Sequence, residues 1–352
     1  MNGKMFKILL VSSLVVLLIS CGPSEEAIAT MTAAAWTPTP LPTATPTLIP
    51  YGLRVSITDE ESTTISYAHI LLQELGEDIH EVDEGGQVSF GGLPEETVTL
   101  DISAPGYLPS QVSETIERGN NEISVILKQD PSGYLPSQAC RENETLLYIE
   151  DFQDGKAQDW DQIMASIEYN APGWLIQPDG EEPDNQILVA SNSSDFADSS
   201  YYYGGFEPFS NAVWRIKVKY DGQDNDMFLN WLQGGTEEGD WRYIVHFGGP
   251  AQLTLERLQN PEPGHFGVGG SGKNLKEGQW YDFEISTFNG TSELWLDGDK
   301  VASYTDPQPL EGGTIGLEVH LFEGSNSIYY FDNMAVCGLS APFETIVPPE
   351  TD

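Results

Sequence analysis

Asp282 and Glu284 are the first candidates for chemistry, because residues two positions apart on a strand point to the same side. Paired carboxylates hydrolyse glycosidic bonds, and in retaining enzymes the two groups lie about 5 Å apart. Here a third acid at the neighbouring positions is missing, and Arg215, Lys217 and Lys219 also share one strand face. A ladder of surface ion pairs is the simpler interpretation of both sets.

Motifs for other reactions are absent from the sequence. It contains no His-Glu-x-x-His, no Gly-x-Ser-x-Gly, no phosphate-binding glycine loop and no zinc cluster, and its five histidines are scattered singly. We therefore predict a protein without catalytic residues or a catalytic cofactor. A site assembled from distant residues stays open as the alternative.

Binding is better supported, because five polar side chains alternate with apolar neighbours such as Leu229, Val245 and Leu317. If those neighbours point into a core, the polar residues line the opposite face of one sheet. Amide, carboxylate and guanidinium groups are the partners that sugar hydroxyls need. Plain solvation of this face is the alternative. The five residues are Asn230, Arg242, His246, Glu318 and His320.

Aromatic residues gather in the same part of the chain. Seven of the eight tryptophans lie between residues 160 and 295, together with the run Tyr201-Tyr202-Tyr203. Sugars stack on aromatic faces, which favours a carbohydrate-binding module. For each single tryptophan, packing in a core or a hairpin is the alternative.

The N-terminal segment has the parts of a secretory signal. Lys4 and Lys7 occur without an acid, and thirteen mainly apolar residues follow from Ile8 to Ser20. Thirteen residues are too few to span a bilayer, which needs about 20. The ending Leu18-Ile19-Ser20-Cys21 resembles the bacterial lipobox. This resemblance implies that residues 1–20 are removed and that Cys21 carries lipid; an ordinary signal with an incidental cysteine is the alternative.

The segment after Cys21 cannot form a packed core. Residues 37–50 contain five prolines in fourteen positions, which favours an extended stalk of roughly 43 Å. We therefore expect residues 21–50 to be a lipidated stalk. It would hold the remainder outside the cytosol, on the bacterial cell membrane or the outer membrane.

Charge excludes one class of partner. After the signal, 13 basic residues face 55 acidic ones, a formal charge near −42 (13 − 55). Nucleic acids and anionic membrane surfaces both attract cationic patches, so neither is an expected partner. The expected contacts are a membrane through the lipid, and a glycan or a surface protein.

Residues 51–129 alternate like short antiparallel strands separated by Gly, Pro and Asn turns, which predicts a small β-sandwich. The strand candidates are 53–57, 68–72, 88–90, 98–102 and 123–127. The segments Asp83–Phe90, Gly92–Pro94 and Ser103–Tyr107 resemble the carboxypeptidase regulatory-like domain. That resemblance implies a transthyretin-like or immunoglobulin-like sandwich that acts as a spacer. A linker is expected over residues 130–139.

One hexapeptide occurs twice. Gly106-Tyr107-Leu108-Pro109-Ser110-Gln111 recurs letter for letter at Gly133–Gln138. The two copies are 27 residues apart without further similarity, so they are not a repeat array. A local duplication that now serves as the linker is the favoured interpretation, and the pattern itself indicates no function.

Residues 140–338 contain many short strand candidates and no sustained helical period, which indicates a second, larger sandwich. The segments Gly278–Ile285, Glu293–Gly298, Gly312–Leu317 and Tyr330–Val336 resemble the concanavalin A-like lectin/glucanase and laminin G-like group. The resemblance implies a jelly roll. Glucanases of that group use the pattern Glu-x-Asp-x-x-Glu, which this sequence lacks. Residues 339–352 are expected to be a disordered tail.

Cys140 and Cys337 lie at the two ends of this larger module. Exported chains keep disulfides, and the first and last strands of a sandwich often lie side by side. We predict a Cys140–Cys337 bond; two free buried thiols are the alternative.

The same resemblance implies a structural calcium ion between the opening and the last strand. Glu150, Asp151 and Asp332 occupy the comparable places, and calcium binds six to eight oxygens. Ordinary surface or turn acids are the alternative in a chain with 55 of them.

The leading hypothesis is therefore an all-β, membrane-anchored surface lipoprotein whose C-terminal domain binds carbohydrate or another surface partner. A glycan hydrolase with a dispersed site is the second hypothesis. A purely structural envelope or adhesion protein is the third.

Overall fold

The computed structural model describes residues 50–76, 79–94, 96–157, 160–164, 173–191, 197–203, 208–222, 226–236, 239–248, 252–260, 264–270, 275–321 and 327–343. The predicted signal, Cys21 and most of the predicted stalk lie outside these residues. Within them, every regular element is a strand except the 3₁₀ turn Gln73–Leu75 and the short helix α2 (Pro136–Ala139). The all-β prediction is confirmed. No helix in this part of the chain combines the length and the apolar character that a bilayer crossing requires.

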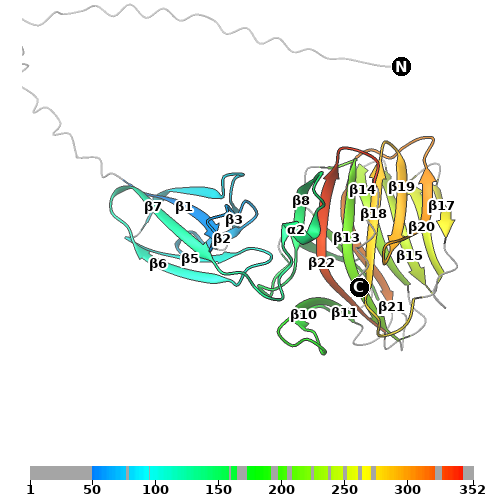
Figure 1. The fold of residues 1–352 in the computed structure, drawn as a ribbon, viewed down its shortest axis with the longest axis horizontal. Coiled ribbons are helices and arrows are strands. Elements are labelled where there is room, and N and C mark those ends of the chain that lie inside the picture. Colours follow the sequence, from blue (N-terminus) through cyan, green and yellow to red (C-terminus); the bar gives the residue numbers. More distant parts are fainter. Residues whose placement is uncertain are drawn as a thin grey trace, which may run out of the picture. The chain divides into compact units, whose positions relative to one another are not determined.

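The smaller module consists of two facing sheets (Figure 1). In the first sheet, β1 (Tyr51–Asp59) lies between β4 (Gln87–Leu93), which is antiparallel to it, and β7 (Gly119–Leu127), which is parallel. The second sheet has the order β3 (Ile79–Glu81), β2 (His69–Leu72), β5 (Thr97–Ser103) and β6 (Ser110–Thr115). Both sheets contribute alternate apolar residues to one shared core, such as Val55 and Leu100. The expected small sandwich is therefore present.

The larger module is also a two-sheet sandwich (Figure 1). One sheet has the order β10 (Gly173–Pro178), β11 (Gln186–Ser191), β22 (Ile328–Leu339), β13 (Ala212–Asp221), β18 (Tyr281–Phe288), β19 (Thr291–Leu296) and β20 (Asp299–Thr305), and β8 (Glu144–Glu150) also pairs with β22. The other has the order β17 (Gly264–Gly270), β16 (Gln252–Gln259), β15 (Gly239–Gly248), β14 (Asp226–Thr236), β21 (Thr314–Leu321), β12 (Ala197–Tyr203) and β9 (Trp160–Met164).

The tryptophans explain how these two sheets pack. Trp214 on β13 and Trp231 on β14 stack between the sheets with 6.5 Å between their ring centroids, and both are fully buried. The indole N–H of Trp231 donates to the Thr287 hydroxyl on the opposite sheet at 2.8 Å. Trp160 and Trp174 are buried as well. For these four residues the core-packing alternative applies, and they are not surfaces for sugar.

An Asp-Gly hairpin joins β19 to β20. Asp297 and Gly298 have φ values of 50° and 80°, the left-handed conformation that a two-residue turn requires.

The end of the chain differs from the expected tail. β22 continues to Leu339, and the Phe343 ring is buried beneath the guanidinium carbon of Arg141, 4.7 Å from the ring centroid. This cation–π contact and the apolar neighbours of Phe343 hold the chain on the sheet. Residues 339–343 are therefore part of the larger module, and residues 344–352 lie outside the described residues.

Candidate ligand-binding face

Three adjacent strands, β14, β15 and β21, position the side chains that the sequence singled out. Leu229, Val245 and Leu317 point into the core and are fully buried. Because successive side chains on a strand alternate, the residues between them point to the other side of the sheet. All five predicted residues lie on that outer face: Asn230 on β14, Arg242 and His246 on β15, and Glu318 and His320 on β21.

Glu318 contacts three of the other four predicted residues. Its carboxylate accepts a hydrogen bond from the Asn230 amide at 3.0 Å and pairs with the Arg242 guanidinium at 3.6 Å. The other carboxylate oxygen lies 2.8 Å from His320 Nε2. Burial by itself would raise the pKa of Glu318. The bonds from His320 and Asn230 and the charge of Arg242 nevertheless hold that pKa below its usual value.

His246 belongs to a second polar group on the same face. Its ring nitrogens lie 3.3 Å from an Asp226 oxygen and 3.0 Å from a Glu256 oxygen. Hydrogen bonds to Asp226 and then Glu256 raise the pKa of His246 to about 9. The bond to His246 in turn lowers the pKa of Glu256 to about 2. At neutral pH this group is therefore an imidazolium held between two carboxylates.

An aromatic residue separates the two groups. The Phe228 ring stacks on the His246 ring at 4.5 Å between centroids and contacts the His320 ring at 4.7 Å. Phe228 pairs with His246 on one side and Glu318 on the other, so the three strands bring these residues into one row. Because the Phe228 ring packs against both His246 and His320, it helps to hold the two imidazoles in position.

Sequence reasoning missed Phe228, Asp226, Glu256 and His265. His265 on β17 lies 2.5 Å from a Glu256 oxygen. The strand alternation that identified Asn230 also applies to Phe228 and Asp226, so this signal was available. The pairing of β15 with β16, and of β16 with β17, was not available, because it depends on sheet order.

Among the described residues, two buried polar atoms on this face lack a hydrogen-bond partner. They are Asn230 Oδ1, an acceptor, and Arg242 Nε, a donor. Buried polar atoms are nearly always paired, and an unpaired one costs about 1–3 kcal/mol. One unpaired donor and one unpaired acceptor in the same cluster suit a ligand that offers both, as a hydroxyl group does.

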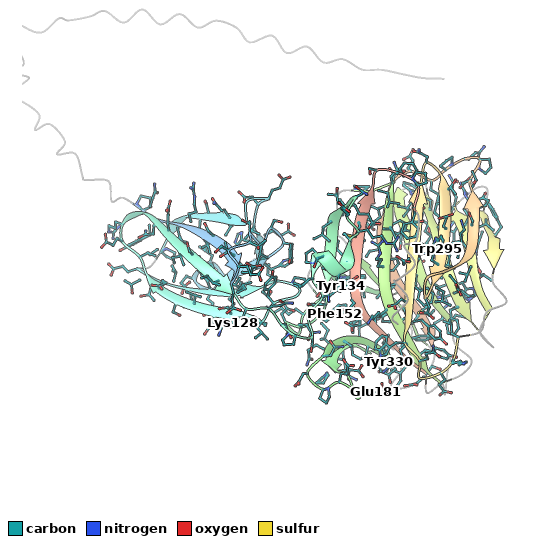
Figure 2. The ribbon with its side chains drawn as sticks, in the orientation of Figure 1. Lys128, Tyr134, Phe152, Glu181, Trp295 and Tyr330 are labelled. Carbon is teal, nitrogen blue, oxygen red and sulfur yellow. A yellow bond between two sulfur atoms is a disulfide. The ribbon has the colours of Figure 1, made fainter. Side chains whose placement is uncertain are left out.

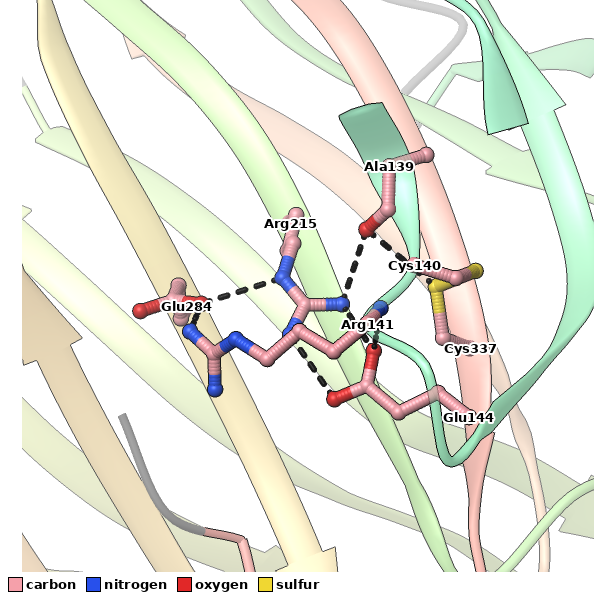
Figure 3. The surroundings of a disulfide bond; sticks show 7 residues. All are labelled: Ala139, Cys140, Arg141, Glu144, Arg215, Glu284 and Cys337. Carbon is pink, nitrogen blue, oxygen red and sulfur yellow. Dashed lines mark hydrogen bonds and ion pairs between the residues drawn. A yellow bond between two sulfur atoms is a disulfide. The ribbon is translucent and has the colours of Figure 1, made fainter. Parts of the chain in front are cut away.

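The paired acids Asp282 and Glu284 lie on β18 of the other sheet. Glu284 accepts from Arg215 Nε at 3.0 Å and from Arg141 at 2.6 Å, and Arg215 also binds Glu144 through two nitrogens (Figure 3). The ion-pair interpretation is therefore supported for Arg215 and Glu284. The pair is not on the surface, because α2, β8 and Phe343 cover Arg215 and leave it 9% exposed.

The predicted disulfide is confirmed. Cys140 and Cys337 are joined with 5.8 Å between their Cα atoms, next to the Arg215 cluster (Figure 3). In the described part of the chain, only Cys140, Glu144 and Cys337 form a group whose potential metal-binding atoms all lie within 4.8 Å of one another. Because both sulfurs are in the disulfide, this group is not a metal site.

The predicted calcium residues Glu150, Asp151 and Asp332 are buried near the start of the larger sandwich. Burial raises the pKa of Asp332 to about 7 and that of Asp151 to about 6, and it raises the pKa of Glu150 well above its usual value. Asp332 accepts from the Asn185 amide at 3.1 Å. One Asp151 oxygen accepts two backbone N–H groups. The three carboxylates do not form a close group, so the calcium site stays a prediction.

Comparisons with known proteins gave matches to solved structures at low identity. No family model matches the chain, and no curated protein matches it. Among solved structures, it is similar to a carbohydrate binding module from Bacillus subtilis, with 11% identity over 51% of this chain and 94% of that chain and a TM-score of 0.36. A Bacteroides ovatus glycoside hydrolase of family 16 that acts on mixed linkage glucan gives 11% identity, 54% and 100% coverage, and a TM-score of 0.44. The Bacillus licheniformis β-glucanase is 11% identical over 55% of this chain and 97% of that chain, with a TM-score of 0.39. These similarities are too low to transfer the role of any residue.

Proposed function

We propose that the larger sandwich binds carbohydrate, or another hydroxyl-bearing surface partner, on the outer face of β14, β15 and β21. The observation that supports this most directly is the cluster around Glu318. Asn230 Oδ1 and Arg242 Nε are buried there, and neither has a partner among the described residues. Once the side chains that cover them move aside, a ligand hydroxyl group can donate to the first and accept from the second.

The state of the acids on this face favours binding over catalysis. Hydrolysis of a glycosidic bond needs one carboxyl group that keeps its proton and one that is ionised. Glu256 and Glu318 both have lowered pKa values, and each carboxylate already has several partners. Neither is suited to donate a proton near neutral pH. The proposed role is therefore non-catalytic.

The location completes the proposal. Cys21 would carry lipid, residues 21–50 would form the stalk, and the two sandwiches would be displayed outside the cytosol. The disulfide agrees with this location, because disulfides persist in oxidising compartments.

Binding of the full chain to immobilised neutral β-glucans, fructan and polyuronates tests the ligand. Arg242→Met removes the donors of Arg242 and keeps its apolar stem, so affinity should fall roughly tenfold or more. Lys300→Met on β20 of the other sheet is the matched control, because Lys300 pairs with Glu293 on an exposed surface. Equal affinity of both variants for the bound glycan would contradict the proposed face.

The hydrolase alternative has a separate test. The full chain is incubated with the same polysaccharides, and new reducing ends are measured. We expect none. Turnover that Glu318→Gln abolishes would show that the face is catalytic, whereas the absence of both turnover and glycan binding would favour the purely structural hypothesis.

The calcium ion is proposed as a structural ligand of the larger sandwich. If Glu150, Asp151 and Asp332 hold it, calcium should raise the melting temperature and a chelator should lower it, because a bound cation stabilises buried carboxylates. The Glu150→Gln and Asp332→Asn double variant should lose this response. A melting temperature that calcium and chelator leave unchanged would count against the site.

A further inference from the structure

Both copies of the duplicated hexapeptide meet at a single carboxylate. Oδ2 of Asp151 accepts the backbone N–H of Gly106, in the first copy, at 2.5 Å. The same oxygen accepts the backbone N–H of Tyr134, in the second copy, at 3.0 Å. Asp151 directly follows β8 of the larger sandwich and is 3% exposed, whereas Gly106 lies in a turn of the smaller one. One buried oxygen thus connects the two modules.

The glycines of the two copies touch each other. A Cβ atom on Gly133 would lie 2.5 Å from Gly106 Cα and 2.7 Å from its carbonyl carbon, so only glycine fits there. Gly106 has a φ of 87°, which L side chains rarely adopt. Asp130 fixes the approach, because its N–H donates to Gly106 O at 2.9 Å and its own carbonyl accepts from Gly133 N–H at 3.1 Å.

The second copy also places one side chain in each module. Leu135 packs against the core of the smaller sandwich. Its neighbour Tyr134 packs against the cluster of Ala139, Val213 and Cys337 in the larger sandwich (Figure 2). Burial raises the pKa of Tyr134 above its usual value, in keeping with this enclosed position. The two sandwiches accordingly belong to one compact unit.

We propose that the duplicated hexapeptide is a clamp that holds the two sandwiches in one orientation. Asp151 is the shared acceptor, and the Gly106–Gly133 contact brings the two backbones together. Tyr134 packs on the larger sandwich and Leu135 on the smaller one. The clamp does not depend on the proposed ligand. The clamp would keep the orientation of the larger sandwich relative to the smaller one fixed, instead of letting the two rotate about a flexible linker.

Small-angle scattering and limited proteolysis of the full chain test the clamp. Gly133→Ala forces the two backbones apart, so the radius of gyration should rise and cleavage within residues 130–139 should become roughly tenfold faster. Gly180→Ala is the matched control, since a Cβ there meets nothing within 4 Å. Circular dichroism and the intact disulfide would confirm that both sandwiches are folded.

Asp151→Ala, compared with the parent chain in the presence of a chelator because Asp151 is also a predicted calcium residue, provides an independent test without added bulk. It removes the shared acceptor, and it should give the same expansion and the same faster cleavage if the modules separate. It also decides the matter should Gly133→Ala fail to fold. Scattering curves and cleavage rates equal to those of the parent chain in the folded variants would overturn the clamp.

Discussion

At the scale of single residues, His246 shows how neighbours set the charge of this face. In isolation a histidine is mostly neutral at physiological pH. Here Asp226 and Glu256 hold a proton on the ring, and Phe228 keeps the ring in place. Both acids thereby gain a cation in a chain that has very few. The face is consequently a network of internal pairs rather than a row of free acids.

This network predicts a pH dependence of stability. The pKa of His246 rises from 6.5 to about 9 on folding. A raised pKa means that the stabilisation is complete below about pH 6.5 and is lost as the pH rises through about 9. The free energy of unfolding should therefore fall by about 1–3 kcal/mol over this range. Chemical denaturation at pH 6 to 9.5 measures it.

The matched variants are His246→Gln and His80→Gln. His246→Gln should flatten the pH dependence, because glutamine keeps a hydrogen-bonding group without the titrating charge. His80→Gln, on β3 of the smaller sandwich, should keep the dependence of the parent chain. If the free energy of unfolding of His246→Gln depends on pH as strongly as that of the parent chain, groups other than His246 cause the effect.

At the scale of elements, the disulfide secures the pairing of the first and last strands of the larger sandwich. β8 lies beside β22, with Val336 opposite Tyr148 and Cys337 opposite Leu146. Arg215 holds the same region from the neighbouring strand through Glu144 and the Ala139 carbonyl (Figure 3). Without these connections, β8 would keep its ladder to β22 and the packing of Tyr148 and Ile149.

Removal of the disulfide should destabilise the larger sandwich. The bond closes a separation of 197 residues, for which the chain-entropy model gives about 5 kcal/mol as an upper value. The Cys140→Ser and Cys337→Ser double variant should have a lower melting temperature than the parent chain. Reductant should lower the melting temperature of the parent chain toward that of the variant and leave the variant unchanged. A melting temperature that reductant leaves unchanged would contradict this prediction.

At the scale of the whole molecule, the proposed anchor and the charge act together. A lipid at Cys21 would localise the chain, and several acyl chains hold a protein far more firmly than one. The formal charge near −42 (13 − 55) of the processed chain repels anionic headgroups and would favour an extended position away from the membrane surface.

Cys21→Ser tests this arrangement directly. The parent chain, expressed in a bacterium, should incorporate labelled palmitate and sediment with membranes, whereas Cys21→Ser should do neither. Retention of residues 1–20 in the variant, detected by intact mass, would accompany the loss of lipid. An unlabelled parent chain with its N-terminal segment still attached would contradict the lipoprotein proposal.

The local pattern of residues determined a large part of the fold. Alternation of apolar residues identified strands such as 53–57 and 98–102, because this pattern depends on neighbours in the sequence. The same pattern missed β3 and β6, whose residues are mostly exposed and carry little apolar signal.

Alternation also selected Asn230 and His246 for the outer face, but it could not supply their partners. Which strand lies beside which is decided by long-range packing. Only the tertiary structure could therefore place Glu256 against His246, bury Arg215 beneath Phe343, and bring Gly106 and Tyr134 to the same oxygen of Asp151. Pairings between distant segments depend on sheet order and on the volume of the core, and neither is encoded in the spacing of neighbouring residues.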